Sequence, residues 1–144
     1  MSESTRAVDA AQQALNSISV ISLFVEDVPA TKAFYEDVFG VETVFEDESS
    51  ACVRFDGMFV NLLDVSAAEE QVDRVANREA GSRFQLSIWV DDVDAVCETL
   101  RARGVALLSG PADREWGMRS ATFADPAGHS WEVAQEVLQP SNAA

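Results

Sequence analysis

Two segments of the chain repeat one pattern of hydrophobic and polar positions. Leu23–Val28 (LFVEDV) and Ile88–Val93 (IWVDDV) each consist of an apolar run that leads into two acidic residues. Such a run ahead of a helical pattern is typical of a strand that turns into a helix. Gly40 and Gly104 follow the two segments at similar distances, and each suits the C-terminus of a helix. The chain is therefore expected to contain two copies of one supersecondary unit.

Helical periodicity follows both segments. The first helix is expected to begin at about Pro29, a residue type tolerated in a first helical turn, and to bury Phe34, Tyr35, Val38 and Phe39. The second is expected to end near Arg103 and to bury Val93, Val96, Cys97 and Leu100. The paired acids Glu26-Asp27 and Asp91-Asp92 favour capping of the two helix N-termini over acid/base catalysis.

Three short strand-like runs follow each helix. They are Val41–Glu46, Ala51–Phe55 and Met58–Val65 in the first half, and Val105–Leu108, Met118–Phe123 and Ser130–Glu136 in the second. Asp56-Gly57 marks a tight hairpin, and Asp125–Gly128 marks a longer turn. The element order is βαβββ twice, which predicts an α+β fold.

The pattern divides the chain into a single domain and two short ends. The domain is expected at 17–137, with modules at about 18–65 and 84–136 and a polar linker at 66–83, in which Val72 and Val75 favour a helical turn. Residues 1–16 form an N-terminal extension with a helical pattern, and residues 138–144 are expected to be a disordered tail.

Composition narrows the class of function. The chain has 144 residues, 25 of them acidic and 10 basic, for a net charge of −15, which disfavours nucleic acid as a partner. No apolar run approaches the length of a membrane span or a secretory leader, so we expect a cytoplasmic protein with no membrane contact. The acidic excess has two interpretations: a codon or salt adaptation, which we favour, or a field that attracts a cationic ligand.

The arrangement resembles the vicinal oxygen chelate superfamily, which includes glyoxalase I, extradiol dioxygenases and bleomycin-resistance proteins. The resemblance spans residues 18–136 and is carried by Ile21–Val28, Phe34–Gly40 and Phe123–Val133. It implies two tandem βαβββ modules that form a cupped, partly open mixed sheet, with helices on the outer face. It is closest to the metal-independent, bleomycin-resistance-like members.

The resemblance also implies positions for metal ligands. Enzymes of the superfamily take one ligand from the first and one from the last strand of each module, usually His and Glu or Gln, then His and Glu. These positions fall on Val20, Asn61, Gln85 and Glu132 in this chain. A divalent ion needs several anionic or imidazole donors, so we expect no metal and no cofactor. The only histidine, His129, is interpreted as a turn residue.

Side chains in phase with those four positions are expected to share one face, because side chains alternate across a strand. We expect this face to bind an organic ligand through stacking and a few polar groups. The alternative is that its aromatic residues simply fill a core. A hairpin near Trp116 is expected to border the site, and Arg119 or a cationic ligand group is a candidate partner for Glu132. The expected ligand-binding residues are Phe24, Phe59, Asn61, Gln85, Trp89, Trp116, Arg119 and Glu132.

Three functions compete. The first, which we favour, is a metal-independent binding protein and not an enzyme: a homodimer that sequesters a small organic ligand, such as an antibiotic or an aromatic or cationic metabolite. The second is a metal-dependent lyase, isomerase or dioxygenase with an atypical ligand set around Glu132. The third is a subunit with a vestigial pocket that acts through protein association.

Overall fold

A computed structural model describes residues 15–72 and 74–137 of the chain. The predictions of a helical N-terminal extension and a disordered tail concern residues 1–14 and 138–144 and lie outside the described residues.

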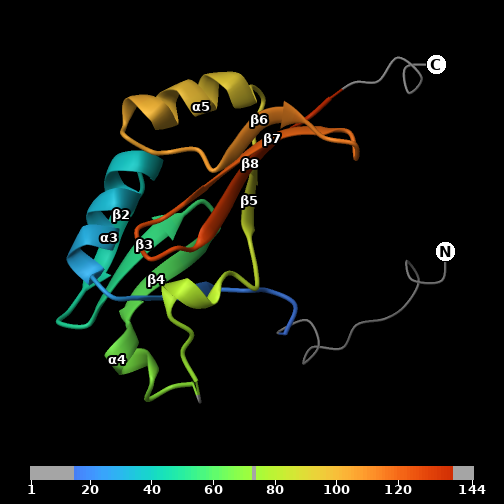
Figure 1. The fold of residues 1–144 in the computed structure, drawn as a ribbon. Coiled ribbons are helices and arrows are strands. Elements are labelled where there is room, and N and C mark those ends of the chain that lie inside the picture. Colours follow the sequence, from blue (N-terminus) through green and yellow to red (C-terminus); the bar gives the residue numbers. More distant parts are fainter. Residues whose placement is uncertain (1–14, 73, 138–144) are drawn as a thin grey trace.

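The first module is a four-stranded mixed sheet with one helical segment (Figure 1). Its strands lie in the order β1-β4-β3-β2, so β1 is at an edge and pairs in parallel with β4. The helix α3 continues directly into a π-helical turn, η1, and packs on β3 and β4. The elements are β1 (Val20–Val25), α3 (Val28–Phe34), η1 (Tyr35–Phe39), β2 (Glu42–Glu46), β3 (Ser50–Phe55) and β4 (Met58–Asp64).

The second module repeats this plan. Its strand order is β5-β8-β7-β6, with β5 at the edge and parallel to β8, and α5 packs on β6, β7 and β8. The structure thus confirms the two tandem βαβββ units, as two separate open sheets. The elements are β5 (Leu86–Trp89), α5 (Val93–Ala102), β6 (Ser109–Asp113), β7 (Met118–Ala124) and β8 (Ser130–Glu136).

The paired acids and the two glycines bound the helices as expected. The Asp27 carboxylate accepts a hydrogen bond from the Ala30 backbone N–H at 3.0 Å, and Asp92 caps α5 in the same way through Ala95. Gly40 ends η1 in the left-handed conformation, with φ of 69°, which a residue with a Cβ adopts only at a cost. The repeat in the sequence is therefore a repeat of helix-bounding chemistry.

The prediction of a strand at Val105–Leu108 is wrong. Val105 is buried and Leu107 packs against the core, but both belong to a loop, and β6 begins only at Ser109. The apolar run reflected the burial of a loop. β6 is an edge strand, where Pro111 is tolerated because its missing N–H faces no partner strand.

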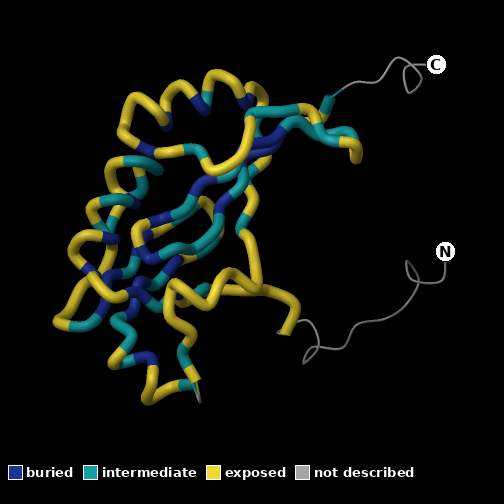
Figure 2. The backbone as a smooth tube through the Cα atoms, in the orientation of Figure 1, coloured by how far each residue is buried: buried dark blue, intermediate teal, exposed yellow. Residues whose placement is uncertain are grey.

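The linker is short of regular structure and exposed over most of its length (Figure 2). It contains one helical turn, α4 (Val65–Ala68), and one 3-10 turn, η2 (Arg78–Ala80). These turns lie on either side of Val72 and Val75, where a helical turn was expected.

An aromatic cluster joins the two modules on the face of each sheet that carries the helices. Trp131 of β8 stacks on Phe55 of β3, with ring centroids 5.7 Å apart, and lies 4.7 Å from Phe39 of η1. Phe39 also contacts Phe123 of β7. The modules of one chain therefore share a core on their helix-bearing faces, and the opposite face of each sheet takes no part in it.

Candidate functional site

Alternation along the strands separates a core face from the face on which the site was expected. In β1, Leu23 and Val25 are buried beneath the helices, whereas Val20 and Ser22 point the other way and are exposed. We call this second side, in both sheets, the open face. The register places on it the side chains chosen for their phase, Val20, Ser22, Phe24, Phe59, Asn61, Leu63, Gln85, Ser87, Trp89, Ser130, Glu132 and Ala134.

In the first sheet the open face is largely apolar, with one amide. Asn61 lies opposite Ser22 and is half-buried, while Phe59 lies opposite Val20 and is exposed. Phe24 continues the same row beside Leu63. This face offers a small polar centre between apolar side chains.

In the second sheet the polar side chains of the open face satisfy one another. The Ser87 hydroxyl donates to Glu132 Oε1 at 2.7 Å, and Gln85 Nε2 donates to Ser130 Oγ at 3.0 Å. Trp89 lies opposite Ala134 and is 76% exposed. Glu132 thus has a partner in its own sheet, which answers how this carboxylate is satisfied.

The expected ion pair between Arg119 and Glu132 is not formed. Glu132 lies opposite Thr122 in the ladder, so Arg119, three residues earlier on β7, points to the other side of the sheet. There its guanidinium binds Asp94 of α5 at 2.9 Å and Asp113 of β6 at 3.1 Å. These carboxylates raise the pKa of Arg119 through hydrogen bonds, so its role in this chain is to attach α5 to the sheet.

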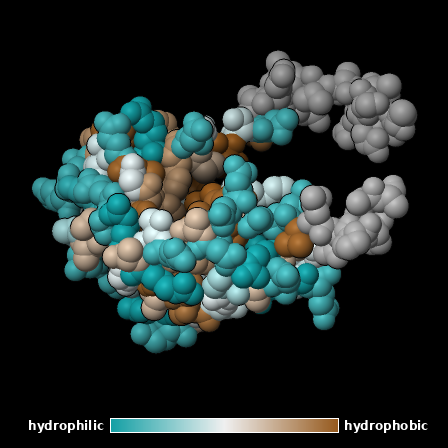
Figure 3. All heavy atoms as spheres, turned by 90° about the horizontal axis from the view of Figure 1, so that it is seen from above, coloured by the Kyte–Doolittle hydropathy of each residue, from teal (hydrophilic) through white to brown (hydrophobic). Residues whose placement is uncertain are grey.

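The expected site residues do not gather in one cavity of a single chain. Phe24, Phe59 and Trp89 each line a different shallow hollow. Trp116 lies in the turn before β7 and is exposed. Among the described residues, no printed hydrogen bond or ion pair links the open face of the first sheet to that of the second. Figure 3 shows a surface on which apolar side chains lie in a hollow bordered by polar ones.

His129 belongs to a buried hydrogen-bond network in the turn after β7, as its interpretation as a turn residue implies. Asp125, which is 3% exposed, contacts His129 Nδ1 at 2.8 Å and accepts a hydrogen bond from the Tyr35 hydroxyl at 2.7 Å. That hydroxyl in turn accepts from Trp131 Nε1 at 3.0 Å. Burial first, and the Asp125 charge second, raise the pKa of Tyr35, which keeps it a proton donor. Sequence reasoning missed this link between the modules.

The residues at the superfamily's metal positions do not fit a divalent ion. They supply one carboxylate, two neutral amides and the hydrocarbon side chain of Val20, and the carboxylate is already engaged by a hydroxyl. Within residues 15–72 and 74–137, three or more His, Cys, Asp or Glu side chains do not converge as a metal site would require. The open face has the chemistry of a contact surface for an organic molecule.

Sequence reasoning also missed a group of arginines in the linker. Arg74, Arg78 and Arg83 line one hollow together with Phe84 and His129. The available signal was three arginines within ten residues of a chain whose net charge is −15. In the described residues, no helix is long and apolar enough to cross a membrane.

Comparisons with known proteins agree with this architecture. A model of the Glyoxalase/Bleomycin resistance protein/Dioxygenase superfamily matches residues 17–133. The chain is 27% identical over 125 residues to the metallothiol transferase FosB of Lysinibacillus sphaericus, covering 87% of this chain and 86% of FosB. It is 32% identical over 119 residues to the uncharacterized protein YraH of Bacillus subtilis, covering 78% and 93%. A crystal structure of a glyoxalase/bleomycin resistance protein/dioxygenase from Nocardioides matches with a TM-score of 0.79 at 25% identity, covering 96% of this chain and 93% of that one.

Proposed function

The chain belongs to the Glyoxalase/Bleomycin resistance protein/Dioxygenase superfamily, and from this premise we propose that it is a metal-independent small-molecule-binding protein. Its ligand is an organic molecule with an aromatic or cationic part, such as an antibiotic or a metabolite, that the protein sequesters without chemical change. The proposal includes the cytoplasmic location expected from the sequence.

The observation that carries the proposal is the composition of the open face. Trp89 is 76% exposed in the middle of a sheet whose other side is packed. Isolated surface tryptophans are uncommon on a sheet face unless they contact something, because a large apolar surface is left in water. The neighbouring Glu132 and Gln85 are held by hydroxyls that a ligand can replace or share. Stacking on Trp89 with polar anchors beside it is the usual composition of a ligand site.

A second copy of the chain is part of the proposal. Both open faces lie away from the core that the modules of one chain share, and each sheet ends in a strand, β1 or β5, with an unpaired edge. A homodimer in which the open face of one module meets that of the partner's other module would join these edges and enclose Phe59, Asn61, Trp89 and Glu132. Because each chain carries a net charge of −15, the association should strengthen with salt.

Isothermal titration against a panel of cationic glycopeptide and aromatic antibiotics tests the proposal. We expect at least one to bind with a saturable isotherm and Trp89→Ser to abolish the signal. Leu108→Ser, which removes a comparably exposed apolar side chain from the loop before β6, is the matched control and should bind as the parent does. Silence across the panel, together with no resistance on expression, would remove the drug-binding version.

The second candidate is a metal-dependent enzyme with an atypical ligand set around Glu132. The observation that favours it is the similarity to FosB, a protein named as a metallothiol transferase. Elemental analysis of protein purified without chelator separates the two candidates. Stoichiometric metal that disappears in Glu132→Gln would support the enzyme. Less than stoichiometric metal, unchanged after adding Mn, Fe, Ni or Zn, would support the binding protein.

A further inference from the structure

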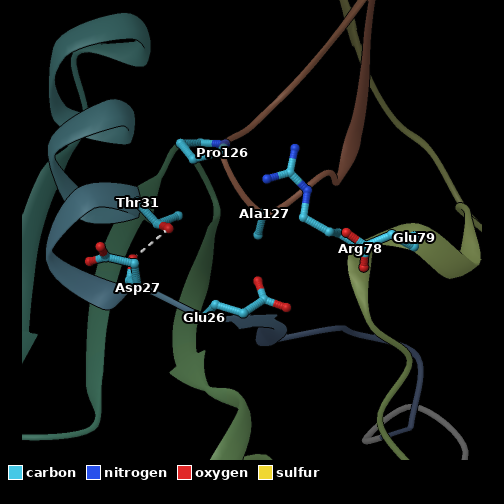
Figure 4. A pocket seen from close by; sticks show the side chains of 7 residues that line it. All are labelled: Glu26, Asp27, Thr31, Arg78, Glu79, Pro126 and Ala127. Atoms are coloured by element: carbon cyan, nitrogen blue, oxygen red, sulfur yellow. Dashed lines mark hydrogen bonds between the residues drawn. The ribbon is translucent and has the colours of Figure 1, made fainter.

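A groove lies between the linker and the turn that joins β7 to β8, apart from the metal positions of the superfamily. Its volume is about 240 Å³, and its lining combines arginines with two phenylalanines, Phe24 and Phe84. A neighbouring hollow shares Glu26, Arg78 and Ala127 with it, and Figure 4 shows Arg78 of the linker opposite the turn at Pro126 and Ala127, with Glu26 below. The two hollows therefore form one continuous depression between the modules.

The charge of this groove is opposite to that of the molecule. Arg74, Arg78 and Arg83 line it, which is three of the ten basic residues of a chain with a net charge of −15. Glu26 is the one acidic side chain in its lining. Among the described residues, none of the three arginines forms an ion pair, whereas Arg54, Arg103 and Arg119 all do. A local concentration of uncompensated guanidinium groups attracts an anion.

The fold holds part of the groove in place. A Cβ built on Gly128 would lie 3.3 Å from the Cβ of Arg78, so the linker backbone passes close against the turn. Asn77 caps η2 through the Ala80 backbone N–H at 3.1 Å, which fixes the start of the turn that carries Arg78. On the other wall, the Phe84 and His129 rings lie 6.1 Å apart, and Asp125 holds His129. Arg78 is therefore presented by packed backbone.

We propose that this groove binds a small organic anion, with a single carboxylate on an aromatic or other apolar body. The planar guanidinium of an arginine binds a carboxylate through two parallel hydrogen bonds, and Arg78 and Arg83 supply this at the linker side. Phe24 and Phe84 supply the apolar walls. The volume lies below the range of about 300–1,000 Å³ typical of drug-sized ligands, which points to a body of one or two rings. Glu26 disfavours a second negative charge at the far end.

Titration of the full chain with 2-naphthoate, followed by isothermal calorimetry and by amide NMR shifts, tests this inference. The neutral isostere 2-naphthamide is the companion probe. We expect saturable naphthoate binding, with shifts confined to residues 74–84, 127–129 and the end of β1, and binding of the amide at least about tenfold weaker. Arg78→Gln and Arg83→Gln should each weaken naphthoate binding about tenfold, because each removes a charge-assisted hydrogen bond.

Two further variants give the test opposite signs. Arg101→Gln on α5 makes the same change in net charge outside the groove and should leave naphthoate affinity within about twofold. Glu26→Gln removes the acid from the groove and should tighten binding several-fold. Equal affinity for naphthoate and naphthamide, no saturable naphthoate binding, or equal weakening by Arg78→Gln and Arg101→Gln would each overturn the inference. None of these variants lies among the polar anchors or the tryptophan of the open face, so failure here leaves the proposed function standing.

Discussion

The buried Tyr35 hydroxyl offers the sharpest test of how the two modules are held together. It is fully buried, donates to the Asp125 carboxylate of the second module at 2.7 Å and accepts from Trp131 Nε1 at 3.0 Å. Tyr35→Phe keeps the ring and removes both hydrogen bonds. A hydrogen bond to a charged group contributes about 1.5–3 kcal/mol, and a buried donor left unpaired costs about 1–3 kcal/mol. Asp125 keeps its bonds to the backbone N–H groups of Ala127 and His129.

We therefore expect Tyr35→Phe to lower the free energy of unfolding by about 3 kcal/mol, and the melting temperature by about 10 °C for a domain of this size. Urea unfolding followed by circular dichroism measures the first quantity. The matched control is Thr43→Val, which removes an exposed hydroxyl that donates to Glu36 at the same 2.7 Å and should cost no more than about 0.5 kcal/mol. A loss for Tyr35→Phe as small as that of the control would refute the reasoning.

The same residue predicts a dependence on alkaline pH. Burial, followed by the Asp125 charge, raises the pKa of Tyr35, whereas an unfolded tyrosine ionises at about pH 10. Above that pH the folded protein retains a proton that the unfolded chain has lost, so the free energy of unfolding should fall by up to about 1.4 kcal/mol per pH unit. Tyr35 is the only tyrosine, so tyrosinate absorbance reports it alone. The absorbance should appear only with unfolding, and titration of the folded protein near pH 10 would contradict the assignment.

Three further changes test separate parts of the structure. Gly110→Ala places a Cβ against the Ser120 carbonyl oxygen at a φ of 81°, and should cost about 1–3 kcal/mol more by thermal unfolding than Gly57→Ala, whose Cβ meets nothing; equal costs would show that the backbone relaxes. Arg119→Gln should lower the melting temperature, with a loss that shrinks in high salt, and a loss that does not change with salt would argue against an ion-pair role. Trp89→Ser should leave monomer unfolding within about 0.5 kcal/mol while weakening self-association measured by sedimentation, and unchanged association would remove Trp89 from the interface.

The fold followed from the sequence because the signals were local. Asp27 and Asp92 cap helices in any context, and Gly40 ends a helical segment through its own φ. Alternation along β1 and β8 placed each side chain on the correct side of the sheet. The exception at Val105 shows the limit of this reasoning, because an apolar run records burial, and a loop that crosses a core is buried like a strand.

The site was harder to predict because it depends on which strands are neighbours. The partner of Glu132 is Ser87, in the parallel strand, and a sequence gives no register for a parallel pair so distant along the chain. Arg119 was assigned to Glu132 by its chemistry, and the ladder turned it to the other side. The linker arginines line a groove only because Arg78 packs on the turn at Gly128, a contact that no periodicity reveals.

The native mass of freshly purified protein, measured under non-denaturing conditions, tests the central claim most directly because it reports subunits, metal and retained ligand together. The account predicts twice the 15.6 kDa mass of one chain, with no stoichiometric divalent metal, and with added mass only where a small organic molecule is retained. A monomer would contradict the completion of the open faces by a second copy. One divalent metal per chain, lost in Glu132→Gln, would contradict metal-independent binding.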